Sequence, residues 1–111
     1  MIEVIKEKDD DSFRFSLKAE SGSVLLTSAL FQNEGEVSRI VQSLGILQGK
    51  RNAFERKTNH DGQFLFHLKN VNGEVIGTSQ SYRSEAGMEN GIKNLKKRIL
   101  DLASSDQLQL P

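Results

Sequence analysis

Apolar and polar residues alternate most clearly in the second half of the chain. Over residues 64–69, Phe64 and Phe66 fall on one face of an extended strand and His67 on the other. Asn72-Gly73 then supplies a turn in which a positive φ costs little, and a β-branched run resumes at Val75. The pattern predicts a β-hairpin over residues 64–79.

The same pattern occurs earlier in the chain at a constant offset, since 64 − 13 = 51 and 73 − 22 = 51. Across nineteen aligned positions, background composition would give roughly one identity by chance. The identical residues in the first copy are Phe13, Phe15, Leu17, Lys18, Gly22, Val24, Thr27 and Ser28. We therefore predict a tandem duplication.

Two segments change to helical spacing. In the first, Asn33 can cap a helix that has Glu36 three residues further on, and Gly45 is a plausible stop. In the second, Ser84 is the expected cap and Glu85 the first helical residue. The apolar positions at helical spacing are Val37, Ile40, Val41 and Leu44 in the first segment, and Met88, Ile92, Leu95, Ile99 and Leu102 in the second.

Shorter alternating stretches complete the expected sheet. Residues 2–7, 13–19, 23–28 and 53–59 predict further strands. At the end of the chain, Leu108 and Leu110 lie one strand period apart, which predicts that residues 107–110 pair with a sheet edge, within the chain or in a dimer.

The second-half motif resembles the YegP-like family of small bacterial proteins. It consists of Asn72-Gly73-Glu74-Val75-Ile76-Gly77-Thr78-Ser79, followed by Tyr82, Ser84 and Glu89-Asn90-Gly91-Ile92, and it is preceded by Phe54-Glu55-Arg56-Lys57. The resemblance covers nearly the whole chain. It implies an α+β fold: a tandem duplication of a three-strand/helix/strand unit, forming one mainly antiparallel sheet with two helices packed on one face. It further implies a strand after each helix, exchanged between the repeats, and it brings no established activity and no catalytic residues.

The first half departs from this motif at two places. Arg39-Ile40 stand where the second half has Asn90-Gly91, and Leu26 stands where it has Gly77. A site built on these residues would therefore exist once in the molecule.

Length and composition give one domain over residues 1–111, made of two repeats (about 1–51 and 52–103) and a tail, 104–111. Each half is too short to form a stable hydrophobic core by itself, so we expect one core that both halves share. The fifteen basic and fifteen acidic residues give the chain a formal net charge of zero at pH 7. The chain start lacks a signal-peptide layout, and no apolar run is long enough to span a bilayer, so we expect a cytoplasmic protein without a membrane partner.

The sequence offers little catalytic chemistry. There is no cysteine, and neither His60, beside Asp61 in a turn, nor His67, in a strand, has an evident nucleophile to activate. The three aspartates of 9–11 lack the spacing of a calcium loop and are typical of a solvated turn. We therefore expect no enzyme activity, no metal site and no cofactor.

Basic residues provide the one candidate binding surface. The sheet face opposite the phenylalanines and the second helix together supply Arg14, Lys18, His67, Lys69, Asn90, Lys93, Lys96 and Lys97, with Arg98 beside them. Sheet platforms for single-stranded nucleic acid stack bases on exposed aromatic rings, which this face lacks. A solvated polar face is the simplest interpretation.

A glycine inside the second helix, Gly91, breaks the local preference for helix formers at a cost of about 1 kcal/mol. Close packing of the helix on the sheet explains it best, and a groove beside Asn90 is the functional alternative. Altogether, the sequence favours a small non-enzymatic binding or interaction module, a monomer or an edge-strand homodimer, for an unknown protein or small ligand. A nucleic-acid-associated protein using the basic sheet face and the basic face of the second helix is the alternative.

Overall fold

The computed structural model describes residues 2–6, 12–50 and 52–105 of the chain. Along these residues, three strands and a helix are followed by three strands and a longer helix. The elements are β1 (Ile2–Lys6), β2 (Phe13–Lys18), β3 (Val24–Ser28), α1 (Glu34–Leu47), β4 (Phe54–Thr58), β5 (Phe64–Lys69), β6 (Val75–Thr78) and α2 (Glu85–Ser104). The fold is α+β, as predicted.

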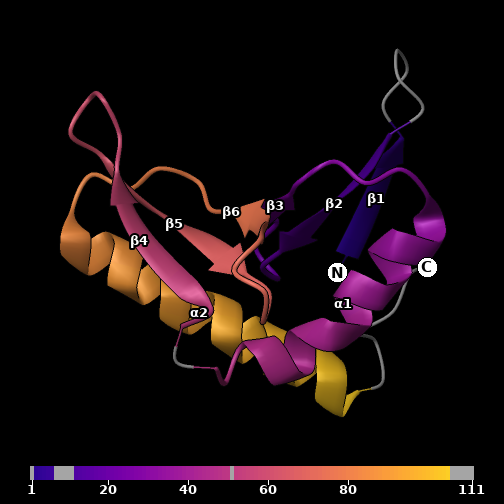
Figure 1. The fold of residues 1–111 in the computed structure, drawn as a ribbon. Helices are drawn as coiled ribbons and strands as arrows, with labels where there is room; N and C mark the ends of the chain where they lie inside the picture. Colours follow the sequence, from indigo (N-terminus) through magenta and orange to yellow (C-terminus); the bar gives the residue numbers. More distant parts are fainter. Residues whose placement is uncertain (1, 7–11, 51, 106–111) are drawn as a thin grey trace.

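The six strands form one antiparallel sheet in the order β1-β2-β3-β6-β5-β4. The strand order is symmetric about the centre of the sheet. Each half forms a three-stranded meander, and the two meanders meet where β3 pairs with β6. At this junction Thr27 lies opposite Thr78, and Ser28 lies opposite Gly77. Figure 1 shows the two meanders rising on either side of the central pair.

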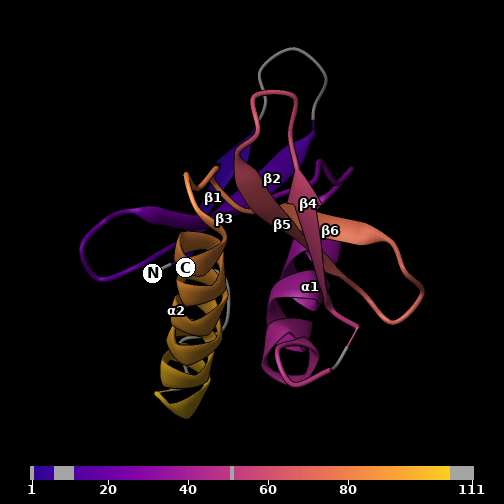
Figure 2. The same cartoon turned by 90° about the vertical axis from the view of Figure 1, so that its left-hand side faces the viewer.

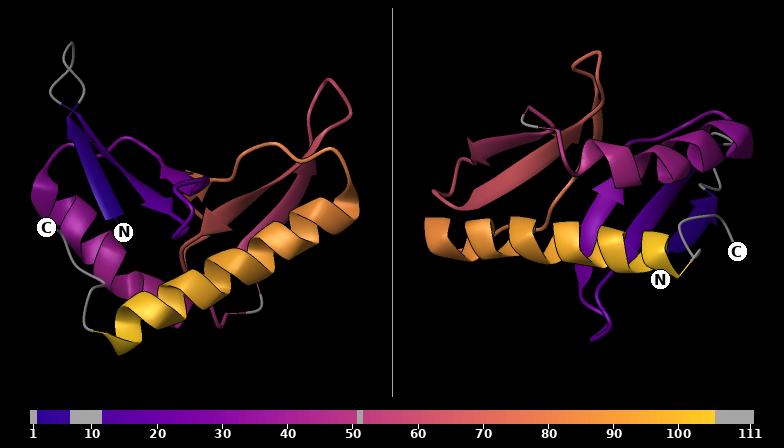
Figure 3. Two further views of the ribbon diagram at one scale, coloured as in Figure 1. Left: turned by 180° about the vertical axis from the view of Figure 1, so that it is seen from behind. Right: turned by 90° about the horizontal axis from the view of Figure 1, so that it is seen from below.

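Both helices lie on the same side of the sheet and leave its other face uncovered (Figures 1 and 2). The left view of Figure 3 shows both helices below the strands, and α1 and α2 are in contact with each other. One cluster of buried apolar residues fills the space between these layers and draws on both halves. Its largest fully buried members are Phe15, Leu17, Leu26, Val37, Val41, Leu44, Phe66, Leu68, Met88, Leu95, Ile99 and Leu102.

Local sequence explains where the elements begin and turn. The side chain of Asn33 accepts a hydrogen bond from the Glu36 amide, and that of Ser84 accepts one from the Gly87 amide, so both predicted caps are confirmed. The hairpin turn at Gly73 has a φ of 82°, a left-handed conformation that glycine adopts without the steric cost of a β-carbon.

The structure corrects two expectations about element ends. α1 does not stop at Gly45 but continues to Leu47, because Leu47 packs into the core one turn after Leu44. The expected exchange of a strand between repeats is not seen among the described residues, since β4, which follows α1, pairs with β5 of its own half. The predicted strand 107–110 lies outside the described residues. The duplication itself stays a prediction.

Gly91 packs differently from the way we expected. A β-carbon there would overlap the hydroxyl of Tyr82, a residue of the β6–α2 connection, rather than the sheet. Tyr82 is held by paired backbone hydrogen bonds to Phe64, with N–O distances of 2.7 and 2.8 Å. The glycine therefore makes room for a tyrosine that fixes the entry of the chain into α2.

Candidate functional site

A single row of polar residues crosses the uncovered face of the sheet, with one residue from each strand. The pairing register places these six residues side by side, so they share one face of the pleat. From one edge to the other the row is Glu3, Ser16, Thr27, Thr78, His67 and Glu55. Its centre, at the β3–β6 pair, carries two threonine hydroxyls, and each of its ends carries a carboxylate.

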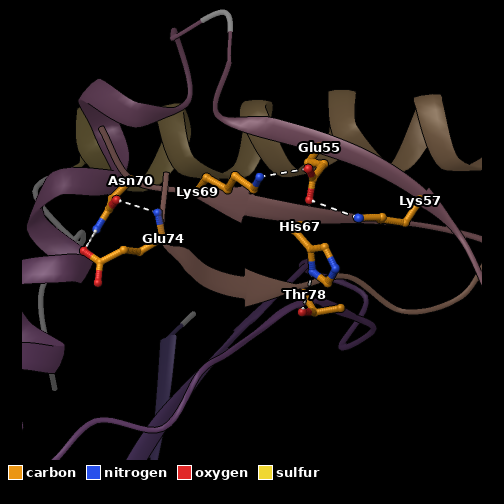
Figure 4. A network of polar contacts seen from close by, with 7 residues as sticks. All are labelled: Glu55, Lys57, His67, Lys69, Asn70, Glu74 and Thr78. Atoms are coloured by element: carbon orange, nitrogen blue, oxygen red, sulfur yellow. Dashed lines mark hydrogen bonds and ion pairs between the residues drawn. The ribbon is translucent and has the colours of Figure 1, made fainter. Parts of the chain in front are cut away.

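In the second half the members of the row bond to one another and to their neighbours (Figure 4). The Nδ1 atom of His67 lies 3.0 Å from the Oγ1 atom of Thr78. The Nζ atom of Lys69 donates to the Oε2 atom of Glu55 at 2.8 Å, and the Lys57 ammonium lies 3.7 Å from the same carboxylate. These contacts hold the long side chains against the sheet.

The hydrogen bond from Lys69 lowers the pKa of the Glu55 carboxyl below its ordinary value, and the nearby positive charges of Lys57 and Lys69 act in the same direction. Glu55 is therefore a carboxylate near neutral pH. A group in this state accepts hydrogen bonds and pairs with cations, but it does not supply the proton of a general acid.

In the first half the equivalent residues of the row form fewer side-chain hydrogen bonds. The Nζ atom of Lys18 donates to the Oε2 atom of Glu3 at 2.9 Å, as Lys69 does to Glu55. The hydroxyls of Ser16 and Thr27, in contrast, form no hydrogen bond with the residues that the structure describes. Ser16 is nevertheless only 7% exposed. Two hydroxyls near the centre of the face thus keep unused hydrogen-bonding capacity.

The predicted binding residues fall on two separate surfaces. Arg14, Lys18, His67 and Lys69 lie on the uncovered sheet face, as their strand phase predicted. Asn90, Lys93, Lys96 and Lys97 lie on α2, which packs against the opposite side of the sheet. The structure therefore does not bring the eight residues together in one patch.

Two basic residues of α2, Lys96 and Arg98, have structural partners. The Nζ atom of Lys96 lies 5.1 Å from the centroid of the Phe54 ring, a cation–π distance. The Nε atom of Arg98 donates to the Lys18 carbonyl oxygen at 3.0 Å, and its Nη1 atom lies 3.6 Å from the Oε1 atom of Glu20. These contacts join α2 to the sheet and to the β2–β3 turn.

The described residues contain no group of three or more histidine, aspartate or glutamate residues that could hold a metal ion. His60 is exposed in the β4–β5 turn. The hydroxyl of Ser79, just after β6, accepts a hydrogen bond from the Phe66 amide and donates one to the Gln80 carbonyl oxygen. The aspartates of 9–11 lie outside the described residues. No helix in the described part of the chain is long and apolar enough to cross a bilayer.

A groove of about 460 Å³ lies between the first turns of α1 and the β5–β6 turn. It was not predicted, because its walls come from segments that are far apart in the chain. The uncovered face was predicted only in part: alternation placed Arg14 and Lys18 on it, but the row through Ser16 and Thr27 depends on the register between strands, which a single sequence does not reveal.

Comparisons with known proteins agree with the motif in the second half of the chain. A family model described as "Domain of unknown function (DUF1508)" matches residues 59–103. A UPF0339 protein of Pseudomonas aeruginosa is 34% identical over 103 residues, which cover 93% of this chain and 94% of that protein. The UPF0339 protein YegP of Escherichia coli K12 is 34% identical over 92 residues, covering 83% and 84%.

Two solved structures match the fold over most of the chain as well as the sequence. The solution structure of a protein of unknown function, yegP of Escherichia coli, has a TM-score of 0.80 at 34% identity and covers 88% of this chain and 84% of that one. A UPF0339 protein of Shewanella oneidensis has a TM-score of 0.78 at 31% identity, covering 86% and 80%. Because both sequence and fold agree over most of the length, the chain belongs to the UPF0339 family of YegP-like proteins, whose function is unknown.

Proposed function

We propose that this protein is a non-enzymatic binding module that contacts its ligand with the uncovered face of the sheet. The observation that carries the proposal is the polar row that crosses all six strands. An antiparallel sheet commonly keeps one face in water, so polarity alone does not distinguish this face. The hydroxyls of Ser16 and Thr27, which form no hydrogen bond with another described residue, do distinguish it.

The face is arranged before any ligand arrives. The lysine–glutamate pairs at both ends fix side chains that would otherwise lose rotamer freedom on binding. Hydroxyls can donate and accept, and the imidazole of His67 can do either according to its tautomer. A partner that is rich in hydrogen-bonding groups, whether a protein surface or a small polar ligand, is the match for this row.

Nucleic acid is the second candidate. Among the described residues of this face, the cations Arg14, Lys18, Lys57 and Lys69 outnumber the carboxylates of Glu3 and Glu55. All the described aromatic rings, however, are buried or packed against the core, so none is offered for base stacking. Retention on immobilised single-stranded DNA that falls steeply with salt would favour this candidate over the first.

A photocrosslinking experiment tests the binding face directly. A benzoylphenylalanine at Leu65, which alternation places on the uncovered face, should form covalent adducts in living cells. The same probe at Leu100, which is exposed on α2, is the matched control and should form none of the same adducts.

A second variant tests whether the row itself makes the contact. Thr27→Val combined with Thr78→Val removes two hydroxyls at nearly constant volume. The Leu65 adduct should then weaken strongly while the fold, followed by circular dichroism, persists. Adducts that are equal at Leu65 and Leu100, or that are unchanged by the threonine substitutions, would exclude the uncovered face as the binding surface.

A further inference from the structure

The groove between α1 and the β5–β6 turn lies away from the polar row and combines apolar walls with charge. Leu30, in the β3–α1 connection, and Val75, at the start of β6, are 45% and 40% exposed, and both line the groove together with Ile40. Removing exposed apolar side chains of this size from water is favourable. The walls therefore suit an apolar side chain.

Charged residues from both walls border this apolar strip. Glu36 of α1 accepts a hydrogen bond from the Gln32 amide at 3.2 Å, and Glu74 of the β5–β6 turn accepts one from the Asn70 Nδ2 atom at 3.1 Å. Neither of these donors is charged. Among the described residues, Arg39 is the only cation that lines the groove, and it forms no hydrogen bond or ion pair with the others. Two carboxylates and one guanidinium give the groove a net negative charge.

The main chain at the groove also lacks partners. The amides on either side of Leu30 are satisfied, because Ala29 donates to the Ile76 carbonyl oxygen at 3.0 Å and Phe31 donates to the Phe13 carbonyl oxygen at 2.7 Å. The amide and carbonyl groups of Leu30 itself form no hydrogen bond with other described residues. If a ligand covered Leu30, these groups would need new partners, and the main chain of a peptide supplies both a donor and an acceptor.

The corresponding place in the second half is built differently. There Tyr82 and Gly91 occupy the positions equivalent to Phe31 and Ile40 of the first half, and the tyrosine hydroxyl lies against the glycine. Asn90 replaces Arg39, so the guanidinium is present on one side of the molecule only. Two of the residues that line this groove, Arg39 and Ile40, therefore have no equivalent of the same type in the second half.

We infer that this groove binds an extended peptide segment of another protein, one that presents an apolar side chain beside a lysine or arginine. The apolar side chain lies against Leu30, Ile40 and Val75, and the cation lies near the carboxylates of Glu36 and Glu74. The main chain of the peptide bonds to the free backbone groups of Leu30. This site is independent of the polar row on the uncovered face of the sheet.

Two acetylated, amidated tetrapeptides, Ala-Leu-Lys-Ala and Ala-Leu-Glu-Ala, test the inference by amide NMR titration of the full-length protein. The lysine peptide should give saturable shifts at Leu30, Ile40 and Val75. The glutamate peptide should bind roughly two- to fivefold more weakly, the size of an exposed ion-pair effect. Shifts that do not saturate, or equal or tighter binding of the glutamate peptide, would overturn the inference.

Matched variants distinguish binding at the groove from nonspecific association of the peptides with the protein. Leu30→Asn should abolish the saturable shifts at Ile40 and Val75, whereas Val71→Asn, at a position that is 79% exposed and outside the groove, should leave them unchanged. Glu74→Gln keeps an acceptor for Asn70 and should remove most of the preference for the lysine peptide. Unchanged titrations in Leu30→Asn, with dispersed spectra showing that the variant is folded, would contradict a site at this groove.

Discussion

The two halves of the sheet share one backbone plan but differ where they meet. In both halves a serine at the end of the third strand accepts a hydrogen bond from an amide of the second strand: Ser28 from Phe15 at 2.8 Å, and Ser79 from Phe66 at 3.0 Å. Both halves also have a register shift at the end of the second strand. At the junction, however, Leu26 of one half faces Gly77 of the other, although the 51-residue offset makes these positions equivalent.

This difference shows how two similar halves can fit closely around a shared centre. A β-carbon at Gly77 would lie 2.9 Å from the Cγ atom of Leu26, so two leucines would collide there, and two glycines would leave a void. The leucine of one half, placed against the glycine of the other, fills the space without a clash. The connection before each helix shows the same compensation, because Tyr82 packs on Gly91 where the first half has Phe31 and Ile40.

The largest expected effect comes from removing the large partner at the junction. Leu26 is fully buried, so Leu26→Ala should lower the free energy of unfolding by about 2–5 kcal/mol through lost burial and a cavity. Urea denaturation measures it, with the slope of the transition checked for constancy. The exchanged pair, Leu26→Gly with Gly77→Leu, should be more stable than Leu26→Gly alone. An exchanged pair that is no better would mean that the junction does not work by size complementarity.

A smaller loss is expected at the helix entry. Gly91→Ala places a methyl group against the Tyr82 hydroxyl, and the overpacking cost of about 1–3 kcal/mol should exceed the gain in helix propensity. Combining it with Tyr82→Leu should make the alanine substitution less costly, because the clashing ring is gone. A higher melting temperature for Gly91→Ala alone would show that the tyrosine moves aside freely.

The two equivalent serines should differ in their contribution according to burial. Ser28 is 5% exposed, so Ser28→Ala leaves the Phe15 amide unsatisfied in the core and should cost about 1–3 kcal/mol. Ser79 is more exposed, and water can replace its hydroxyl, so Ser79→Ala should cost less. Thermal melts of both variants give the comparison, and equal costs would mean that the junction environment is the same on both sides.

The smallest effect concerns the charged end of the second half. Because the Glu55 pKa is lower in the folded protein, its pair with Lys69 contributes stability above the unfolded-state pKa, and this stability is lost as the pH falls through the folded-state pKa. In a carbon-13 NMR titration, Lys69→Gln should raise the pKa of Glu55 towards its ordinary value. Lys18→Gln, at the opposite end of the row, should leave it unchanged. If Lys69→Gln leaves the pKa of Glu55 unchanged, as Lys18→Gln should, the Glu55–Lys69 pair does not persist in solution.

The sequence by itself determined the local elements. Alternation at Phe13 and Phe64 located the hairpins, glycines marked the turns, and Asn33 and Ser84 marked the first turns of the helices. These features depend on neighbours in the chain, whose preferences are local. The motif around residues 72–92 also led to the family before any contact was known. The end of α1 escaped prediction, because burial of Leu47 outweighed the stop signal at Gly45.

Only the tertiary structure decided which surfaces can act. The polar row exists because six strands pair in one register, and a shift by one residue would turn Ser16 and Thr27 towards the core. The basic residues of α2 and of the sheet, which the sequence grouped together, were separated because the helix packs by its apolar side against the opposite face. The groove between α1 and the β5–β6 turn brings Leu30 and Val75 together from distant segments of the chain, and local preferences do not specify long-range packing of this kind.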